Sequence, residues 1–260
     1  MNAPVTPSPF TAAFGLDGLS ALVTGAGRGL GAQIAFALAQ AGATVHAMSR
    51  SAEELDEVVS RVRAAGGRAH ALVCNVTDTA SVDTAIDRLD RLDILVNNAG
   101  TNHPAGFVDV TAAQLDALWQ LNVRSVFTTA QRAARKMIAA GAQGGAIINM
   151  SSQMGHVGAV RRSAYCMTKH AVEGMTKAMA LELAEYRIRV NTIAPTFVET
   201  PMTRTFFEDR GFRDWVMQRL PLGRLLPAED VAQAVCYLAS PAAAMITGTS
   251  LVIDGGWTAQ

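Results

Sequence analysis

Three side chains in one stretch of the chain have types and a spacing that could move a proton. Tyr165 and Lys169 lie four residues apart, and Ser152 lies thirteen residues before the tyrosine. If the segment from about residue 163 is helical, Tyr165 and Lys169 share a helix face about one turn apart. A free phenol titrates near ~10, and a neighbouring ammonium favours its ionised form. The spacing therefore predicts a tyrosine whose pKa is lowered toward neutrality and that acts as a general acid or base.

A proton carrier needs a reaction partner, and the start of the chain offers a nucleotide site. Residues 19–24 are short and apolar, which predicts a buried strand, and they lead into Gly25, Gly29 and Gly31, followed by an apolar helical pattern. In the order strand, glycine loop, helix, such glycines allow a diphosphate to approach the free N–H groups at the helix start. The GxxxGxG spacing differs from the GxGxxG signature of dinucleotide sites. A glycine-rich turn that binds nothing is the alternative.

The end of the second predicted strand, residues 43–48, indicates which dinucleotide is bound. Ser49 and Arg50 follow it, no acidic residue comes before Glu53, and the glycine loop contains Arg28. A carboxylate at this place binds the ribose 2′-OH, whereas arginine favours a 2′-phosphate. The sequence therefore favours NADP(H), with NAD(H) possible. The alternative is that both arginines are solvated surface charges.

The remaining chain alternates predicted strands with predicted helices. The strands are expected at 69–74, 93–96, 146–150, 188–193 and 250–253, and the helices at 51–67, from about 79, and at 111–140, 163–184 and 228–239. This alternation predicts an α/β Rossmann fold with a doubly wound parallel sheet, as a single domain at 18–260 after a flexible tail at 1–17. Aromatic and charged residues at 196–224 predict a substrate-binding lid, with a packed surface helix pair as the alternative.

Composition excludes several other classes of protein. The 260 residues carry a formal net charge of zero, half are hydrophobic and 17% are charged, which argues against nucleic acid or a membrane surface as partner. No apolar run reaches the ~18–20 residues of a membrane span, and the N-terminus does not resemble a secretory signal. Three cysteines without a CxxC pair favour a reduced, cytoplasmic location, and five histidines without ligand spacing predict no metal.

Taken together, these motifs resemble the short-chain dehydrogenase/reductase family from about residue 16 onward. The TGxxxGxG motif of the family appears at 24–31 and its NNAG motif at 97–100, while its active-site residues match Asn122, Ser152, Tyr165 and Lys169 in order. Pro195 also matches the proline after strand six. Two positions depart from many members, namely Thr196, where glycine is usual, and Asn75, where aspartate is usual. The four-residue Tyr–Lys spacing argues against the enoyl-reductase branch.

The resemblance implies an oxidoreductase that transfers a hydride between nicotinamide C4 and a carbonyl carbon or its alcohol. Tyr165 would carry the proton, Lys169 would lower the tyrosine pKa and bind the nicotinamide ribose, Ser152 would hydrogen-bond the substrate oxygen, and Asn122 would support Lys169 through a water. The implied cofactor contacts are Gly25, Arg28, Gly29, Leu30, Gly31, Ser49, Arg50, Asn75, Val76, Asn98, Ala99, Gly100, Tyr165, Lys169, Pro195, Val198 and Thr200. The candidate substrate contacts are Ser152, Gln153, Met154, His156, Tyr165, Thr196, Phe197, Met202 and Phe206.

The substrate class stays open between a sugar, a polyol, a hydroxy acid and a small ketone. One alternative is 3-oxoacyl-[acyl-carrier-protein] reductase, for which Arg132, Arg135 and Lys136 could face the carrier protein. A non-catalytic dinucleotide-sensing protein is the other, although such a protein would be expected to lack the tyrosine or the lysine. The resemblance also implies a homotetramer or dimer formed through helices 111–140 and 163–184. Alanines at 130, 133 and 134 could face either a partner or the core.

Overall fold

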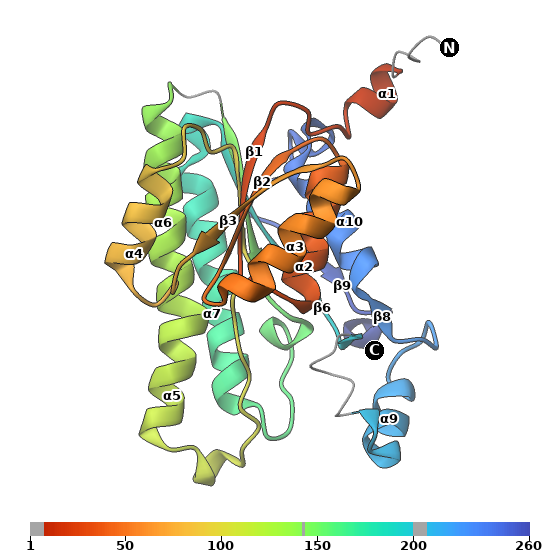
Figure 1. The fold of residues 1–260 in the computed structure, drawn as a ribbon. Helices are drawn as coiled ribbons and strands as arrows, with labels where there is room; N and C mark the ends of the chain where they lie inside the picture. The colour runs from red at the N-terminus through yellow and green to blue at the C-terminus, as the bar shows by residue number, and fades with distance from the viewer. Residues whose placement is uncertain (1–7, 142–143, 200–206) are drawn as a thin grey trace.

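A computed structural model describes residues 8–141, 144–199 and 207–260 of the chain. Its centre is a parallel sheet with the strand order β3-β2-β1-β4-β5-β6-β9, as Figure 1 shows. The strands are β1 (Ser20–Thr24), β2 (Thr44–Ser49), β3 (Arg68–Val73), β4 (Ile94–Asn97), β5 (Gly145–Met150), β6 (Ile188–Pro195) and β9 (Ser250–Ile253), while β7 (Val198–Glu199) and β8 (Leu226–Pro227) pair separately. The predicted doubly wound parallel sheet is confirmed.

Helices cover both faces of this sheet (Figure 1). They are α1 (Pro9–Ala12), α2 (Gly29–Gln40), α3 (Ala52–Ala64), α4 (Thr79–Asp87), α5 (Ala112–Trp119), α6 (Ser125–Ala139), α7 (Ser163–Glu182), α9 (Arg210–Met217) and α10 (Ala228–Ala239). One core cluster joins the sheet to α2, α3 and α10, and a second joins it to α4, α6 and α7. Because both faces of the sheet are covered, its central strands consist of continuous apolar runs rather than alternating patterns.

The carboxyl ends of β1 and β4 meet where the strand order reverses, which is where ligands bind in open α/β sheets. Thr24 Oγ1 accepts hydrogen bonds from the backbone N–H of Asn98 at 3.0 Å and of Ala99 at 3.1 Å. The Asn98 side chain in turn donates to the carbonyls of Thr24 and Gly25, at 3.0 and 3.2 Å. These bonds hold the glycine loop against the end of β4.

The helix predicted at 111–140 is present, and residues 112–139 are helical throughout. It divides into α5 and α6 around a π-helical turn at Gln120–Arg124. Within that turn Asn122 is fully buried, accepts a hydrogen bond from Thr101 N at 2.9 Å and donates to Thr101 O at 2.8 Å. The prediction of a long helix is therefore confirmed, and the structure adds a π-helical turn at the point where Asn122 pairs with Thr101. Such π-turns occur frequently at functional sites.

The two segments predicted to be irregular contain ordered packing. In the N-terminal segment Pro9–Ala12 is helical and Leu16 is completely buried, so the folded domain begins before residue 18. In the predicted lid, Phe207, Val216 and Leu220 are buried against Phe197 and other aromatic residues. Thr200, Met202 and Phe206 lie outside the described residues, and movement of the lid stays a prediction. Among the helices that are described, none combines the length and the apolar character of a membrane span.

Candidate active site

The glycine loop between β1 and α2 is shaped to admit a ligand backbone closely. Gly25 has a φ of +65°, and a Cβ there would lie 2.9 Å from Ala99 Cα. A Cβ on Gly31 would collide with the Gly25 carbonyl oxygen and the Asn98 side-chain nitrogen. No side chain caps the start of α2, so its first N–H groups remain available to an anion. This cradle fits the diphosphate of a dinucleotide.

The end of β2 combines the predicted cofactor residues with an acid that the sequence analysis missed. Arg50 is exposed, and Ser49 Oγ donates to the Ser51 carbonyl at 3.2 Å. Arg28 makes an ion pair with Glu54 at 3.3 Å. A Cβ on Gly27 would lie 2.7 Å from the Glu54 carboxylate, which therefore lies over the glycine loop. Glu54 lies in the first turn of α3, the helix that follows β2, and an acidic residue at this place in the sequence could have identified it.

The residues predicted to contact the adenine follow β3. Asn75 is exposed, and its side-chain oxygen accepts hydrogen bonds from Thr77 N at 3.2 Å and from Thr77 Oγ1 at 2.9 Å. Val76 is buried in the core. Both acceptor positions of the Asn75 side-chain oxygen are thus used to shape its own turn. Contact with the adenine stays a prediction.

The predicted catalytic side chains converge above the end of β5. Lys169 is buried, its ammonium donates to the Met150 carbonyl at 2.8 Å, and it lies 5.6 Å from the centre of the Tyr165 ring. Ser152 is buried and hydrogen-bonds the Tyr165 phenol. A Cβ on Gly100 would lie 3.3 Å from Asn122 Oδ1 and 3.9 Å from Lys169 Nζ. Four segments distant in the sequence thus bring one phenol, one hydroxyl, one amine and one amide together.

The direct hydrogen bonds of the Asn122 side chain are to Thr101 and Thr168 and not to Lys169. Its side chain bonds to Thr101, as described above, and donates to Thr168 Oγ1 at 3.2 Å. Thr168 in turn donates to the Tyr165 carbonyl at 2.8 Å. Asn122 therefore fixes the helix that carries the catalytic pair. Its predicted link to Lys169 through a water remains a hypothesis.

Burial governs the proton affinities of the pair. It raises the pKa of Tyr165 to about 12, and the hydrogen bond with Ser152 offsets only part of that rise. Burial also lowers the pKa of Lys169 to about 8, while the negative charge of Glu173 raises it. The sequence-based expectation of a lowered tyrosine pKa was thus wrong in direction, because removing a phenolate from water is costly. A protonated phenol is the form that can donate a proton to a developing alkoxide.

Lys169 is expected to titrate near pH 8, and Glu173→Gln is expected to lower that pKa by about one unit or more. The chain has only three lysines, so replacing Lys136 and Lys177 by arginine leaves a single side-chain signal for ¹³Cε NMR. Because the charged amine stabilises negative charge left on the phenol, kcat for carbonyl reduction should fall as pH rises through the same value. Glu182→Gln, at an exposed site on α7, should leave the titration unchanged. An unchanged titration in Glu173→Gln would contradict this electrostatic coupling.

A cavity of about 260 Å³ lies in front of the catalytic residues. Of the predicted substrate contacts, those that line it are Ser152, Gln153, Met154, Tyr165, Thr196 and Phe197. Of the predicted cofactor contacts, those that line it are Leu30, Asn98, Gly100, Tyr165, Lys169, Pro195 and Val198. Six residues that were not predicted as contacts also line it: Thr101, Asn102, Met150, Ser151, Arg162 and Phe212. Arg162 could have been identified as a basic residue three positions before Tyr165 in the sequence.

His156, a predicted substrate contact, is not among the residues that line this cavity. Its Nε2 lies 2.9 Å from Ser250 Oγ and 3.2 Å from the buried Glu173 carboxylate. Thr192 also donates to that carboxylate. The structure therefore places His156 in a polar network between α7, β6 and β9, because its ring is turned toward β9 rather than toward the phenol.

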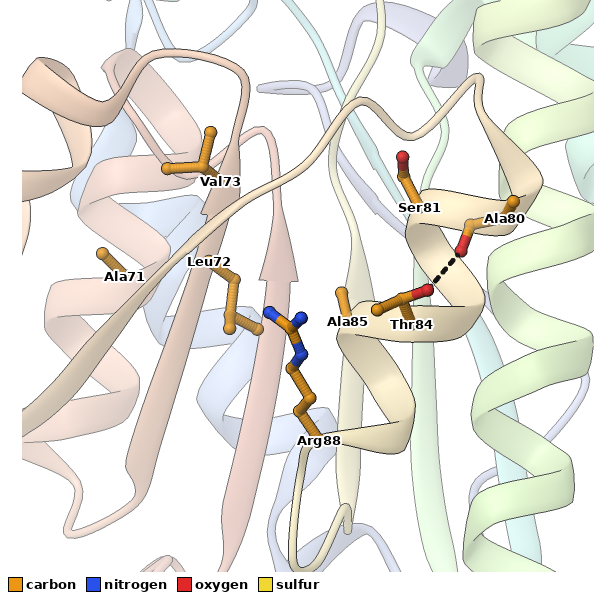
Figure 2. Close-up of a pocket in the computed structure, with 8 residues that line it drawn as sticks. All are labelled: Ala71, Leu72, Val73, Ala80, Ser81, Thr84, Ala85 and Arg88. Carbon is orange, nitrogen blue, oxygen red and sulfur yellow. Dashed lines mark hydrogen bonds between the residues drawn. The ribbon is translucent and has the colours of Figure 1, made fainter.

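A larger cavity, of about 470 Å³, lies between edge strand β3 and α4 (Figure 2). Figure 2 shows Leu72 and the guanidinium of Arg88 facing each other across it, with Thr84 donating to the Ala80 carbonyl at 2.9 Å on the helix side. None of the predicted catalytic or cofactor residues that the structure describes lines this cavity. Cavity size therefore does not locate the active site, which lies at the carboxyl ends of the strands.

Comparisons with known proteins agree with this geometry. The family model described as "Enoyl-(Acyl carrier protein) reductase" matches residues 25–258. The chain is 39% identical to L-xylulose reductase from Mus musculus, with 94% of this chain and 98% of the relative covered. It is 38% identical to 3-oxoacyl-[acyl-carrier-protein] reductase from Thermotoga maritima, with 93% and 98% covered.

The fold is also similar to that of a gluconate 5-dehydrogenase from Burkholderia cenocepacia, solved in complex with NADP and tartrate. The TM-score is 0.92 at 37% identity, and the match covers 96% of this chain and 99% of that one. Identity at this level over nearly the whole chain, together with the glycine cradle and the Asn–Ser–Tyr–Lys set, leaves one assignment. The chain belongs to the short-chain dehydrogenase/reductase family of oxidoreductases.

Proposed function

We propose that this protein is an NADP(H)-dependent oxidoreductase of small sugars, polyols or hydroxy acids. The single observation that carries the proposal is the placement of Tyr165, Lys169 and Ser152 on one cavity that also contains residues of the glycine-loop region. At about 260 Å³ the cavity is below the ~300–1,000 Å³ typical of sites for drug-sized ligands. A short, polar carbonyl compound suits this volume.

In the proposed reduction, a bound nicotinamide supplies the hydride to the carbonyl carbon. The chain's own residues act on the oxygen. Ser152 donates a hydrogen bond that fixes the carbonyl, and Tyr165 gives its phenolic proton as negative charge develops there. Lys169 stabilises the phenolate that remains. Because the pKa of Tyr165 is high, the phenol holds its proton until the substrate oxygen becomes the stronger base.

The preference for the phosphorylated dinucleotide rests mainly on Arg50. Arg28 already pairs with Glu54, whereas Arg50 has no ion pair within the described residues. Arg50→Ala is expected to weaken NADPH binding about tenfold and to leave NADH binding nearly unchanged, because only the 2′-phosphate needs the guanidinium. Fluorescence titration of both nucleotides measures the two dissociation constants.

The matched control for this experiment is Arg135→Ala, which removes an exposed arginine from α6. It should change neither dissociation constant. A tighter Kd for NADH than for NADPH in the unmodified protein, or equal losses for the two nucleotides in Arg50→Ala, would contradict the proposed preference.

The similarity to a 3-oxoacyl-[acyl-carrier-protein] reductase makes that activity the second candidate. Its basic surface would come from Arg132, Arg135 and Lys136. However, Arg132 forms ion pairs with Asp83 and Asp87, and Lys136 donates to the Asp87 carbonyl at 3.2 Å. Two of the three cations are thus engaged within the chain, which favours small carbonyl substrates. Activity on an acetoacetyl thioester compared with ketoses and keto acids distinguishes the two functions.

We further propose that the protein forms a homo-oligomer, namely a tetramer, and that it is located in the cytoplasm. Ala130, Ala133 and Ala134 are buried in the core of the chain itself, so these alanines do not form the interface. Support comes instead from large apolar side chains exposed on α5, α6 and α7, including Trp119, Phe127 and Leu181. Light scattering in solution measures the assembly.

A further inference from the structure

Unsatisfied polar atoms are concentrated in the active-site cavity. Seven buried side-chain nitrogen or oxygen atoms have no hydrogen-bond partner within the described residues. Four of them belong to residues that line this one cavity: Ser151 Oγ, Gln153 Oε1, Arg162 Nε and Thr196 Oγ1. Because a buried polar group without a partner is costly, such a cluster points to a polar ligand that supplies the missing bonds.

The charge in the cavity has one sign. Arg162 and Lys169 line it, and among the described residues that line it there is no Asp or Glu. Lys169 is already held by the Met150 carbonyl at 2.8 Å. Arg162 donates through Nη1 to the Arg161 carbonyl at 3.2 Å, which leaves Nε without a partner in the part of the chain that is described. A cationic donor in such a pocket has a carboxylate as its natural ligand.

The position of Arg162 relative to Tyr165 also limits the distance between the charge and the reacting carbon. Arg162 is the N-cap of α7, three residues before Tyr165, and both side chains line the same cavity of about 260 Å³, where burial raises the pKa of the Tyr165 phenol and the charge of Arg162 lowers it. An acid group on Arg162 therefore lies a few carbon atoms from a carbonyl on Tyr165. Gln153 Oε1 and Thr196 Oγ1 belong to residues on the same cavity and have no partner within the described residues, so the hydroxyl groups of a sugar acid could supply their missing hydrogen bonds.

We propose that Arg162 binds the carboxylate of the substrate, so that this enzyme acts on keto and hydroxy sugar acids in preference to neutral sugars. The expected preference in kcat/KM rests on the proposed reaction. The expected binding of a carboxylate to Arg162 does not, since binding needs no turnover.

The kinetic test compares 5-keto-D-gluconate with L-sorbose. At the end remote from the ketone, the first compound has a carboxylate where the second has a hydroxymethyl group. With NADPH, kcat/KM should favour the acid. Arg162→Gln should lower kcat/KM for the acid about ten- to hundredfold more than it lowers kcat/KM for L-sorbose, because only the acid loses a charged contact. Arg162→Lys should recover only part of the loss, because the amine cannot form the bidentate contact.

The binding test uses tartrate and threitol, which also differ only in carboxylate against hydroxymethyl, and follows the melting temperature of the NADP-saturated protein. At constant ionic strength, tartrate should raise the melting temperature and threitol should not. In Arg162→Gln, tartrate should no longer raise the melting temperature. Arg161→Gln, at the exposed neighbouring position, serves as the matched control and should behave like the unmodified protein.

Two results would overturn the assignment of Arg162. One is equal or better kcat/KM for L-sorbose, and the other is tartrate stabilisation that survives in Arg162→Gln. If no carbonyl compound is reduced but tartrate still binds through Arg162, the proposed reaction fails while the carboxylate site stands. If Arg162→Gln does not fold, Arg162→Lys carries the same kinetic test.

Discussion

Replacing Tyr165 by phenylalanine is expected to lower kcat for carbonyl reduction by about 10³-fold, with little effect on folding or on nucleotide binding. The change removes one hydroxyl group from a half-buried side chain and leaves the packing of its ring intact. That hydroxyl hydrogen-bonds Ser152, and Tyr165 is the only tyrosine among the described residues that line the active-site cavity. Loss of a positioned general acid typically costs 10²–10⁴-fold in rate, while loss of a neutral hydrogen bond costs only about 1 kcal/mol of stability.

The comparison for this variant is Tyr186→Phe, which removes the same hydroxyl from the turn after α7, at Ala184–Tyr186. Its kcat should equal that of the unmodified protein. Both variants should show thermal melting and NADPH dissociation constants close to the original values. A Tyr165→Phe enzyme that retains a tenth of the activity would mean that another group supplies the proton.

The second large effect is expected for Gly31→Ala, which should weaken dinucleotide binding at least a hundredfold and destabilise the protein. The added Cβ would overlap the Gly25 carbonyl oxygen and the Asn98 side-chain nitrogen, and it would lie 2.8 Å from the Gly25 carbonyl carbon. These are backbone and braced groups that cannot move without opening the loop. Overpacking of this kind costs about 1–3 kcal/mol, and the displaced loop no longer fits a diphosphate.

Gly174→Ala provides the matched control for the glycine substitution. Gly174 is exposed in the middle of α7, and no atom lies within 4 Å of the position of its Cβ. Alanine there should stabilise the protein by roughly 0.5–1 kcal/mol, since glycine is a poor helix former. Chemical denaturation and nucleotide titration of both variants give the two free energies. Equal behaviour of the two alanine variants would contradict the role assigned to the glycine loop.

The strands and the glycine cradle could be predicted from local sequence because each depends on local pattern. The run from Ser20 to Thr24 is apolar on both faces, and only glycine tolerates the turn at Gly25. The π-helical turn around Asn122 could not be predicted from local sequence, since it is accompanied by hydrogen bonds to Thr101, twenty-one residues earlier in the chain. Leu16 likewise is buried only because α2 and its neighbours pack over it.

The active-site residues divide in the same way. Motif order predicts Ser152, Tyr165 and Lys169, whereas the candidate substrate contact His156 is bonded to Ser250 on β9, a pairing between residues far apart in the sequence. The direction of the Tyr165 pKa depends on how deeply the fold buries the ring, which spacing alone does not reveal. Arg162 became visible as a ligand only when its unpartnered nitrogen was seen in the cavity.

The central claim is that Tyr165 supplies the proton to the substrate oxygen while hydride is delivered to the neighbouring carbon. Single-turnover decay of the absorbance of enzyme-bound NADPH, after mixing with excess keto substrate, measures that step without interference from product release. The unmodified protein should complete the turnover rapidly, and Tyr165→Phe, shown by titration to bind NADPH equally well, should be slower by about 10³-fold. Decay at the same rate in both proteins would contradict the assignment of the phenol as proton donor.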